Sequence, residues 1–571
     1  MYIYIIMVNS GNATKNEIIH SIKMNDIIVE KMNQDLHNFG IEFNQRLDII
    51  INILNNVEFN DGTENNLIKN NLIESMEKMS INKSEIYQKI FMFYGNKKTK
   101  IDLNQFYTPV TIGEFICSLC IPGKTHIDPA CGTGDLIINY SGKISLWDIS
   151  EDIIEICKLN YNLQQKDYII ECCNSIIQHD KNNGEYDYCS LNPPFGSSTV
   201  ITDSEVLNKY DLGRGKKKEE IGILFIERAI NLLKENGIIF IILPNGYLGN
   251  NTKNSIELRK YLLSYRILCI IELPHNAFSR SGTGVSTSML ILQKTRMDKS
   301  YNIFIHKIEN IGYILNKKNT PYKYKMNKGD YVLVDNKPIL DNDFESCKYL
   351  ISNFINKYLK GNLKGDLESN LESDLNFNTI STNDLDTNKI LDINRYSEIY
   401  KNVVNNMILN NKKKLKDYLK SDVNCKFNII SNKEYLYLDI KQVNSPTYNK
   451  TNLIFGYELP NRAKIELRKN DIIVSKLKGK IVFTIILDEL DNIICTNGFC
   501  LLRPNSLSDS IIIFANLFSK EFKIQHNSFC TGSIMESISD FDIKNIYIND
   551  SIDIPKYTLI MEALEVINSE L

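Results

Sequence analysis

Residues 125–134 read Thr125-His126-Ile127-Asp128-Pro129-Ala130-Cys131-Gly132-Thr133-Gly134. The segment starts as an apolar strand pattern and ends in a glycine turn, directly before a helical pattern. Glycines let a ligand lie against the backbone, and the free amides at a helix start bind carboxylate or phosphate. An ordinary glycine turn with a surface aspartate is the alternative. The candidate cofactor contacts in this turn are Asp128, Ala130, Cys131, Gly132 and Gly134.

Strand and helix patterns alternate around this turn, from residue 123 to about residue 294. Such alternation with short connections predicts an α/β fold, a doubly wound Rossmann-like sheet whose ligands bind beyond the carboxyl ends of the strands. Helices are predicted at 151–164, 219–234 and 255–263. The predicted strands are 125–128, 144–148, 168–172, 186–191, 238–243, 267–273 and 286–293.

The second predicted strand ends at Asp148, twenty residues after Asp128, and Asp148 and the following Ile149 are further candidate cofactor contacts. A carboxylate at this place suits a ribose diol, which needs an acceptor for two hydroxyl groups. A dinucleotide fingerprint would require a third glycine, which Asp135 and Leu136 do not supply. S-adenosylmethionine is therefore preferred over a nicotinamide cofactor.

The fourth predicted strand is followed by Asn192-Pro193-Pro194-Phe195. An exocyclic amino or amide nitrogen is a poor nucleophile because its lone pair is delocalised. The Asn192 oxygen and the Pro193 carbonyl could accept its two hydrogens and favour a tetrahedral nitrogen. Pro193 and Pro194 stiffen the loop, and Phe195 offers a flat face to an extruded base. These four residues are the candidate catalytic group, and Asn192 also faces the predicted cofactor.

Four ordered motifs resemble those of the amino-group DNA methyltransferases that modify adenine at N6. They are 105–109 (Gln-Phe-Tyr-Thr-Pro), 128–134, Asp148 and 192–195. The resemblance covers about 104–294 and is closest to modification subunits of type I restriction systems and their fused type II relatives. It implies that Tyr107 and Thr108 contact the methionine end of the cofactor, and that Phe278 forms a second wall of the base pocket.

One position departs from the family. Where an aspartate commonly contacts the adenine amino group of the cofactor, this chain has Asn174. An asparagine can still accept a hydrogen bond and can also donate one. Asn174 is therefore carried over as a cofactor contact, with polar packing in the core as the alternative.

The remaining chain divides into further parts. We expect an N-terminal helical domain at 1–100, the methyltransferase domain at 101–330, and a connecting segment with a low-complexity linker at 331–411. The segment 412–571 shows alternating apolar patterns and resembles a target-recognition domain of type I specificity subunits, on 435–440, 467–475 and 531–535. An accessory β domain that contacts protein is the alternative.

Composition limits how the chain can meet DNA. Its 571 residues include 66 Lys and Arg against 69 Asp and Glu, a net charge of −3, which disfavours a protein that coats nucleic acid by bulk positive charge. Phosphate contacts must come from local clusters, although short basic runs are commonly just solvated faces. The candidate DNA-binding residues are Arg214, Lys216, Lys217, Lys218, Lys476 and Lys478.

The cysteines and the apolar segments of the sequence indicate neither a metal site nor a membrane span. The thirteen cysteines are scattered, and Cys117 and Cys120 lack partners for a zinc site, so no metal is expected. Without an apolar run of membrane length or a signal-peptide pattern, the expected location is intracellular, in the cytoplasm. The expected partners are double-stranded DNA and a restriction endonuclease, with the chain a monomer or a homodimer.

The leading hypothesis is a sequence-specific DNA adenine methyltransferase that carries catalysis and recognition in one chain. One rival is a protein glutamine methyltransferase, which also uses Asn-Pro-Pro but lacks the 105–109 element and a large recognition domain. A bifunctional restriction enzyme is a second rival, disfavoured because the first hundred residues show no nuclease pattern. A recognition protein with a degenerate core is the third, and the intact 192–195 motif argues against it.

Overall fold

A computed structural model describes residues 108–570, apart from 195–198, 280–283, 316–321, 335–336, 359–377, 386, 422–427, 490–491 and 533–534. The chain forms two compact units, which divide between Leu391 and Asp392. This division precedes the boundary placed at residue 412 from the sequence. The helical domain predicted for 1–100 lies outside the described residues. Within the described ranges, no helix is long and apolar enough to cross a membrane.

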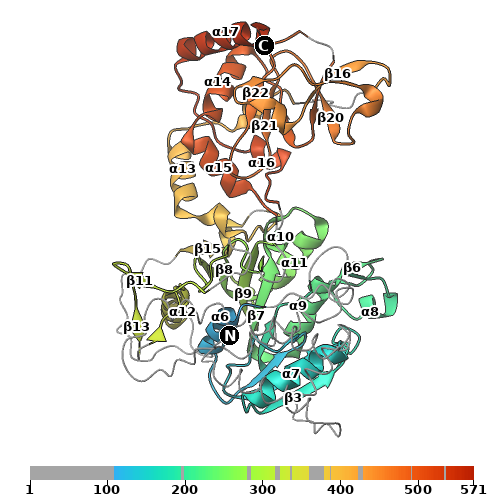
Figure 1. Cartoon of the computed structure of the whole chain (residues 1–571), viewed down its shortest axis with the longest axis vertical. Helices are drawn as coiled ribbons and strands as arrows, with labels where there is room; N and C mark the ends of the chain where they lie inside the picture. The colour runs from blue at the N-terminus through green and yellow to red at the C-terminus, as the bar shows by residue number, and fades with distance from the viewer. Residues whose placement is uncertain are drawn as a thin grey trace, which may run out of the picture. The chain divides into compact units, whose positions relative to one another are not determined.

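The first unit is built on a nine-stranded sheet in the order β15-β10-β8-β9-β7-β4-β1-β2-β3 (Figure 1). The five strands from β3 to β7 are parallel, whereas β9 runs antiparallel between β7 and β8. This topology confirms the predicted doubly wound α/β fold. The strands are β1 Thr125–Asp128, β2 Lys143–Asp148, β3 Tyr168–Cys172, β4 Tyr186–Leu191, β7 Leu233–Pro244, β8 Tyr265–Glu272, β9 Thr287–Arg296, β10 Asn302–Lys307 and β15 Thr379–Ser381.

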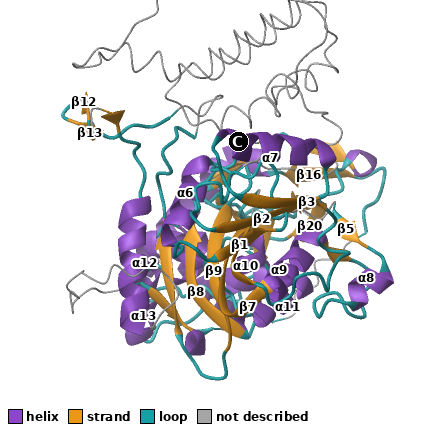
Figure 2. Cartoon of the chain, turned by 90° about the horizontal axis from the view of Figure 1, so that it is seen from below, coloured by secondary structure: helices purple, strands orange, loops and turns teal. Residues whose placement is uncertain are grey.

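Helices cover both faces of this sheet (Figure 2). In β7 every residue from Ile238 to Leu243 is buried. Because alternate side chains of a strand point to opposite faces, both faces of the sheet must be covered. Ile238, Phe240 and Ile242 join the core under α6, α7 and α12, while α9 and α11 lie on the opposite face. The helices are α6 Val110–Leu119, α7 Glu151–Leu163, α9 Ile221–Leu232, α10 Asn245–Gly249, α11 Lys253–Leu263 and α12 Phe344–Tyr358.

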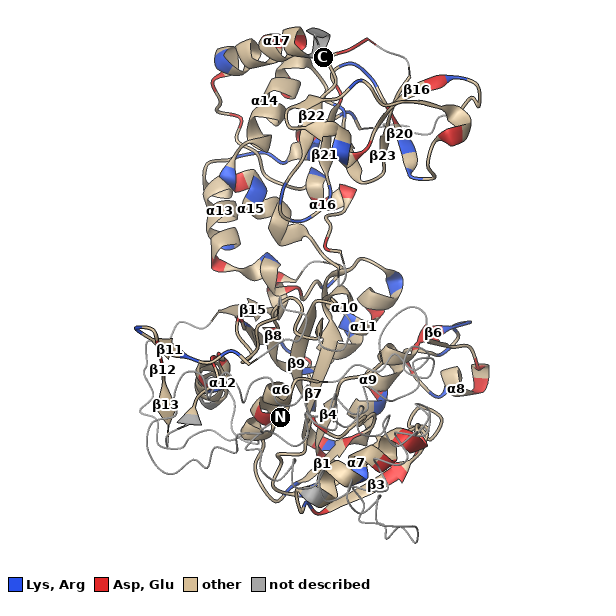
Figure 3. Cartoon of the chain, in the orientation of Figure 1, with Lys and Arg blue, Asp and Glu red and all other residues tan. Residues whose placement is uncertain are grey.

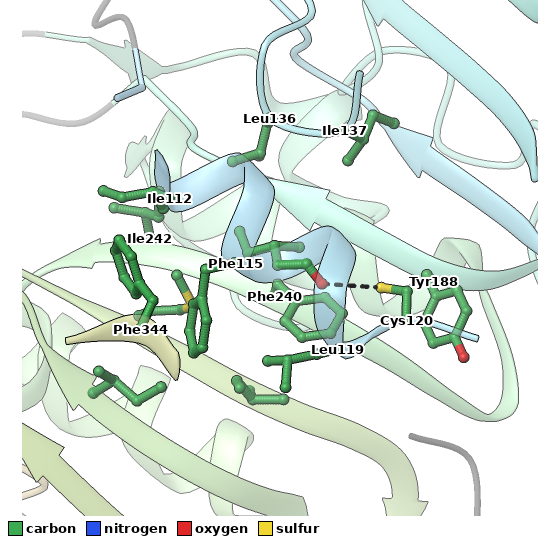
Figure 4. Packing of buried hydrophobic residues seen from close by; sticks show 14 of the residues in the cluster. Ile112, Phe115, Leu119, Cys120, Leu136, Ile137, Tyr188, Phe240, Ile242 and Phe344 are labelled. Atoms are coloured by element: carbon green, nitrogen blue, oxygen red, sulfur yellow. Dashed lines mark hydrogen bonds between the residues drawn. The ribbon is translucent and has the colours of Figure 1, made fainter. Parts of the chain in front are cut away.

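Helix α6 is anchored by large apolar side chains (Figure 4). Phe115 stacks on Phe344 of α12 with ring centroids 4.8 Å apart. Cys120, just past the helix, is buried in the same core and its thiol donates to the carbonyl oxygen of Ile116 at 3.4 Å. These contacts hold the start of α6, and with it Thr108, at the sheet edge.

An insertion separates β4 from α9. Two short strands, β5 (Val200–Ile201) and β6 (Glu219–Glu220), pair antiparallel around α8 (Ser204–Asn208). The amide of Ile221 donates to the carbonyl of Thr199 at 3.1 Å, which ties the two ends of the insertion together. Because 219–220 pair as a strand, α9 begins at Ile221 and not at 219 as the sequence predicted.

The second unit combines small sheets with helices. A four-stranded sheet has the order β19-β16-β23-β20, and a three-stranded sheet the order β22-β21-β24. The predicted β-rich C-terminal region is therefore present. Its strands are β16 Glu434–Leu438, β19 Leu453–Phe455, β20 Ala463–Leu467, β21 Ile472–Ser475, β22 Phe483–Ile485, β23 Ile493–Thr496 and β24 Phe499–Leu502, and its helices are α13 Glu398–Leu409, α14 Leu507–Leu517, α15 Lys520–Phe529, α16 Asp540–Lys544 and α17 Ile554–Glu570.

Short elements complete the two units. In the first unit, two hairpins lie between β10 and α12. In the second, one hairpin follows β16. They are β11 Met326–Asn327 with β12 Asp330–Tyr331, β13 Leu333–Val334 with β14 Lys337–Pro338, and β17 Val443–Asn444 with β18 Thr447–Tyr448.

Candidate active site

A pocket lies at the carboxyl ends of β1 to β4. The chain order reverses between β1 and β4, and doubly wound sheets bind their ligands at such a switch point. The pocket has about 1040 Å³ of empty space, including its open mouth. The predicted site residues that line it are Thr108, Asp128, Ala130, Cys131, Gly132, Asp148, Ile149, Asn174, Asn192 and Pro194.

The glycine turn after β1 is shaped for close approach. Gly132 and Gly134 have left-handed backbone conformations, with φ of +53° and +83°. The Gly132 amide donates to Asp148 Oδ2 at 2.9 Å, and the Tyr161 hydroxyl of α7 donates to the Gly134 carbonyl at 2.9 Å. The turn is thus joined to the end of β2 and packed directly on α7.

Replacing Gly134 with alanine is expected to destabilise the first unit. A Cβ at Gly134 would lie 2.5 Å from Tyr161 Cε2 and 2.7 Å from Cys157 Sγ. The overlap and the positive φ together should lower the free energy of unfolding by about 2–4 kcal/mol. Gly184→Ala is the matched control, because Gly184 has a φ of +75° but no atom within 4 Å of the added carbon. Equal losses in the two variants, measured by thermal unfolding, would contradict the packing argument.

Acidic groups dominate the polar lining. Asp128 and Asp135 are buried, Asp148 is half-buried, and none of the described lining residues is Lys, Arg or His. Burial raises the pKa of Asp128 to about 8; an amide from Ala130 opposes this rise, and the charges of Asp148 and Asp135 add to it. Burial also raises the pKa of Asp148, against backbone amides that include Gly132. The pocket therefore favours a ligand with positive charge.

Asn192 stands where β4 ends. Its amide nitrogen donates to the Thr108 hydroxyl at 3.0 Å, a contact that spans 84 residues of sequence. This contact orients the carboxamide, so its oxygen is the atom that can accept a hydrogen from a substrate amino group. Pro194 lines the pocket, and Pro193 is buried beside it.

Asn174 follows β3 and also lines the pocket. Its Oδ1 accepts the backbone amides of Ile176 and Ile177, each at 3.1 Å. The side chain thus caps the turn after β3, and its acceptor oxygen is engaged within the protein.

Other predicted residues lie elsewhere. Gly134 shapes the turn from behind the pocket wall. Phe278 is only 2 % exposed, belongs to the hydrophobic core and does not line the pocket. Tyr107 and Phe195 lie outside the described residues.

The predicted DNA-binding cations are partly engaged by carboxylates. Lys216 pairs with Glu219 and, at 2.7 Å, with Glu257. Lys217 and Lys218 are exposed and directly precede β6, and Figure 3 shows basic residues beside this strand. Among the rest, Arg214 pairs with Asp211 at 3.2 Å, Lys476 with Asp540 at 2.9 Å, and Lys478 with Glu536.

Several lining residues were not predicted. Asp135 directly follows Gly134, and Ser175 directly follows Asn174. Their position next to predicted residues could have identified them. Ile221 and Phe225 lie four residues apart on one face of α9. The helical pattern predicted α9, but no sequence signal says that this face reaches the pocket. The other unpredicted lining residues are Pro129, Thr133, Leu136, Ile153, Cys173 and Thr199.

Residues 81–329 match the family model described as N-6 DNA Methylase. This match confirms the resemblance that the four motifs indicated. The type I restriction enzyme MpnII methylase subunit of Mycoplasma pneumoniae is 26% identical over 270 residues, 41% of this chain and 48% of that protein. Modification methylase CviBIII of Paramecium bursaria Chlorella virus NC1A is 25% identical over 197 residues, 33% and 49% of the two chains. This chain therefore spans about half the length of the curated relatives it matches.

Among solved structures, this chain also matches the type I restriction-modification system methyltransferase subunit from Streptococcus thermophilus. That structure is 17% identical, with a TM-score of 0.37, and the match covers 58% of this chain and 74% of that one. The type IIG restriction endonuclease BpuSI is 13% identical, with a TM-score of 0.47, over 95% of this chain and 72% of that one.

Proposed function

We propose, from the premise that residues 81–329 belong to the N-6 DNA methylase family, that this chain transfers a methyl group from S-adenosylmethionine to N6 of adenine in double-stranded DNA. The target adenine is flipped out of the duplex to reach the pocket. The observation that carries this proposal is Asn192, oriented by Thr108 at the rim of an acidic glycine-turn pocket. A restriction-modification or DNA-protection context fits the curated relatives, which are a type I restriction enzyme methylase subunit and a modification methylase.

The pocket's donor set fits this cofactor. S-adenosylmethionine carries a sulfonium and an ammonium, and the lining acids Asp128, Asp135 and Asp148 suit two positive charges. Asp148, at the end of β2, would hold the ribose diol, and the backbone of the glycine turn would lie against the ligand. When bound, the cofactor supplies an electrophilic methyl group.

The chain's own residues prepare the nucleophile. The Asn192 oxygen and the Pro193 carbonyl accept the two hydrogens of the adenine amino group, which frees the nitrogen lone pair. No strong general base is needed, because the nitrogen becomes acidic only as its bond to the methyl group forms. In this proposal Phe195 stacks on the flipped base. Phe278, buried in the core, would act there only after a rearrangement.

Recognition is assigned to the second unit, on the strength of its resemblance to target-recognition domains. Its Lys476 and Lys478 would meet phosphates by exchanging their present carboxylate partners, Asp540 and Glu536. In the first unit, the exposed Lys217 and Lys218 bind DNA phosphates in this proposal. They lie next to β6, which pairs with β5, the first strand after the 192–195 motif. A restriction endonuclease is the proposed partner, and the chain acts as a monomer or a homodimer.

One incubation tests the activity. The purified chain is mixed with S-adenosylmethionine labelled on its methyl group, and plasmid DNA, RNA and total protein are then separated. Label recovered as N6-methyladenine in DNA is the expected result. If label were found only in protein, the proposal would be wrong and protein glutamine methylation would take its place. Cleavage of the plasmid would show that the chain also has nuclease activity.

Affinity for the cofactor is expected to rise with pH up to about 8. The pKa of Asp128, raised to about 8 by burial, means that a bound cation must displace a proton below that pH. The affinity for the cofactor should fall by up to about tenfold for each pH unit below 8, and it should no longer change with pH above 8. Without the cofactor the folded chain holds this proton more tightly than the unfolded chain. The free energy of unfolding should therefore fall as pH rises from about 4 to about 8.

Isothermal titration with S-adenosylmethionine between pH 6 and pH 9 measures this dependence. The control is Asp128→Asn, which is expected to bind more weakly and without the slope. A wild-type affinity that does not change over this range would contradict the assigned role of Asp128.

A further inference from the structure

Ser175, at the pocket, carries a buried hydroxyl group that the proposed mechanism does not use. The residue is 3 % exposed and lines the pocket. Its Oγ makes no hydrogen bond to any described residue. Buried hydroxyl groups in folded proteins nearly always have a partner. Ser190 on β4, for example, bonds to His126 at 2.7 Å. A ligand in the pocket would supply the partner that Ser175 lacks.

The neighbouring Asn174 cannot supply the acceptor at this place. Its carboxamide oxygen already accepts two backbone amides, from Ile176 and Ile177. Two bonds use both lone pairs of that oxygen. An amino group of a ligand that approaches the end of β3 therefore needs another acceptor, and the Ser175 hydroxyl lies one residue further along.

A buried arginine holds Ser175 in position. Arg228 on α9 has no exposed surface, and its Nε donates to the Ser175 carbonyl at 3.0 Å. Its Nη2 donates to the carbonyls of Gln178 and Lys181, at 3.1 and 2.6 Å. The Trp147 ring lies 5.6 Å from the guanidinium carbon. Three carbonyls of the loop after β3 and the ring of Trp147 in β2 thus surround one guanidinium, which fixes the backbone that carries the Ser175 side chain.

The proposed ribose contact indicates which group the hydroxyl would meet. Asp148, which would hold the ribose, ends β2, and β2 pairs directly with β3. A base attached to a ribose held there would be within reach of the residues that follow β3, Ser175 among them. The side chains of Ile149 and Phe225 line the same pocket and offer apolar contact for a flat ring. A hydroxyl can accept from an exocyclic amino group and donate to a ring nitrogen.

We propose that the Ser175 hydroxyl recognises the amino edge of the cofactor's adenine, with Arg228 as the positioning residue that fixes it. This inference rests on the proposed function, because it concerns the same cofactor. It moves the acceptor role that the family resemblance implied for Asn174 to the next residue. Asn174 instead shapes the turn.

The test compares two ligands that differ only at that edge. S-adenosylhomocysteine carries the amino group, and S-inosylhomocysteine has an oxygen in its place. The full-length chain is titrated with each by calorimetry. Ser175→Ala should weaken binding of the adenosyl compound about tenfold and leave the inosyl compound nearly unchanged. Ser190→Ala is the matched control, because it removes a buried hydroxyl of the same sheet outside the pocket.

Equal weakening of both ligands by Ser175→Ala, or no weakening of either, would overturn the inference while the proposed function stands. Wild-type chain that binds neither ligand would overturn both. The two failures are thereby distinguished.

Arg228 is tested by Arg228→Lys, which keeps the charge but cannot reach every carbonyl. The expected result is a raised KM for S-adenosylmethionine with little change in kcat at saturation. The adenosyl-to-inosyl preference should fall as it does in Ser175→Ala, and the double variant should lose no more than either single one. Should Arg228→Lys fail to fold, Asn183→Ala removes a Nη1 partner of the same guanidinium and should shift the preference in the same direction. A full wild-type preference in a folded variant would refute the positioning role.

Discussion

An Asn192→Ala variant is expected to lose DNA methylation by about 10²–10³-fold, with S-adenosylmethionine binding largely kept. The alanine removes the oxygen proposed to accept a hydrogen of the adenine amino group, a contact that strengthens as the nitrogen becomes tetrahedral. Because such a contact acts mainly in the transition state, kcat should fall while the cofactor dissociation constant changes little. Single-turnover transfer of labelled methyl to DNA measures the first quantity, and calorimetry measures the second.

Thr108→Val is the companion variant for Asn192. The valine removes the hydroxyl that accepts from the Asn192 amide nitrogen at 3.0 Å but leaves the carboxamide in place. A smaller loss, of about tenfold, is expected because the oxygen is still present but less well oriented. An Asn192→Ala variant with full activity would refute the mechanism. If Thr108→Val lost as much methylation activity as Asn192→Ala, the loss would come from a disturbed fold and not from the orientation of the Asn192 carboxamide.

Asp471→Ala is expected to destabilise the second unit by about 3–5 kcal/mol. Asp471 is 1 % exposed, and its two oxygens accept from Nε and Nη2 of Arg503 at 2.7 and 2.6 Å. It also accepts the Arg468 amide at 2.8 Å. Removal of the carboxylate leaves a largely buried guanidinium without its counter-charge. Calorimetric unfolding of the full chain should show the loss in the transition that S-adenosylmethionine does not shift, since the cofactor binds the other unit.

Asp540→Ala provides the comparison for Asp471. Its partner Lys476 and Asp540 itself are both partly exposed, so the loss should stay below about 1 kcal/mol. If Asp471→Ala left both transitions unchanged, the buried ion pair would have no role in stabilising the second unit.

Much of the nine-stranded sheet was predictable from sequence because its strands are short, apolar and bounded by turn residues. The predicted strands 125–128, 168–172 and 186–191 match β1, β3 and β4 to the residue. The strands β10 and β15 were not predicted. β15 comes from residues 379–381, beyond the low-complexity stretch, and it pairs with β10 across more than seventy residues. Local pattern carries no information on such a distant partner.

The candidate site, too, was predictable only where the local sequence pattern sets the position of a residue. Asp128 and Asp148 end their strands, Asn174 and Asn192 come shortly after theirs, and parallel strands bring such positions together at one edge. The engagement of Lys216 by Glu219 and Glu257 depends on the packing of β6 against α11, which no spacing in the sequence records. Phe278 illustrates the same limit, since a motif gives its residue type but the surrounding core decides what its ring touches.

The insertion between β4 and α9 has a consequence for how this protein can vary. Its two ends are joined by the bond from Ile221 to Thr199, and both of these residues line the pocket. The middle of the segment is fixed as well. The fully buried Tyr210 donates to the Ile176 carbonyl at 2.7 Å, and Glu227 of α9 accepts the backbone amides of residues 211 and 212. Only its exposed positions, such as Lys217 and Lys218, can therefore be exchanged while the geometry around Asn192 is inherited unchanged.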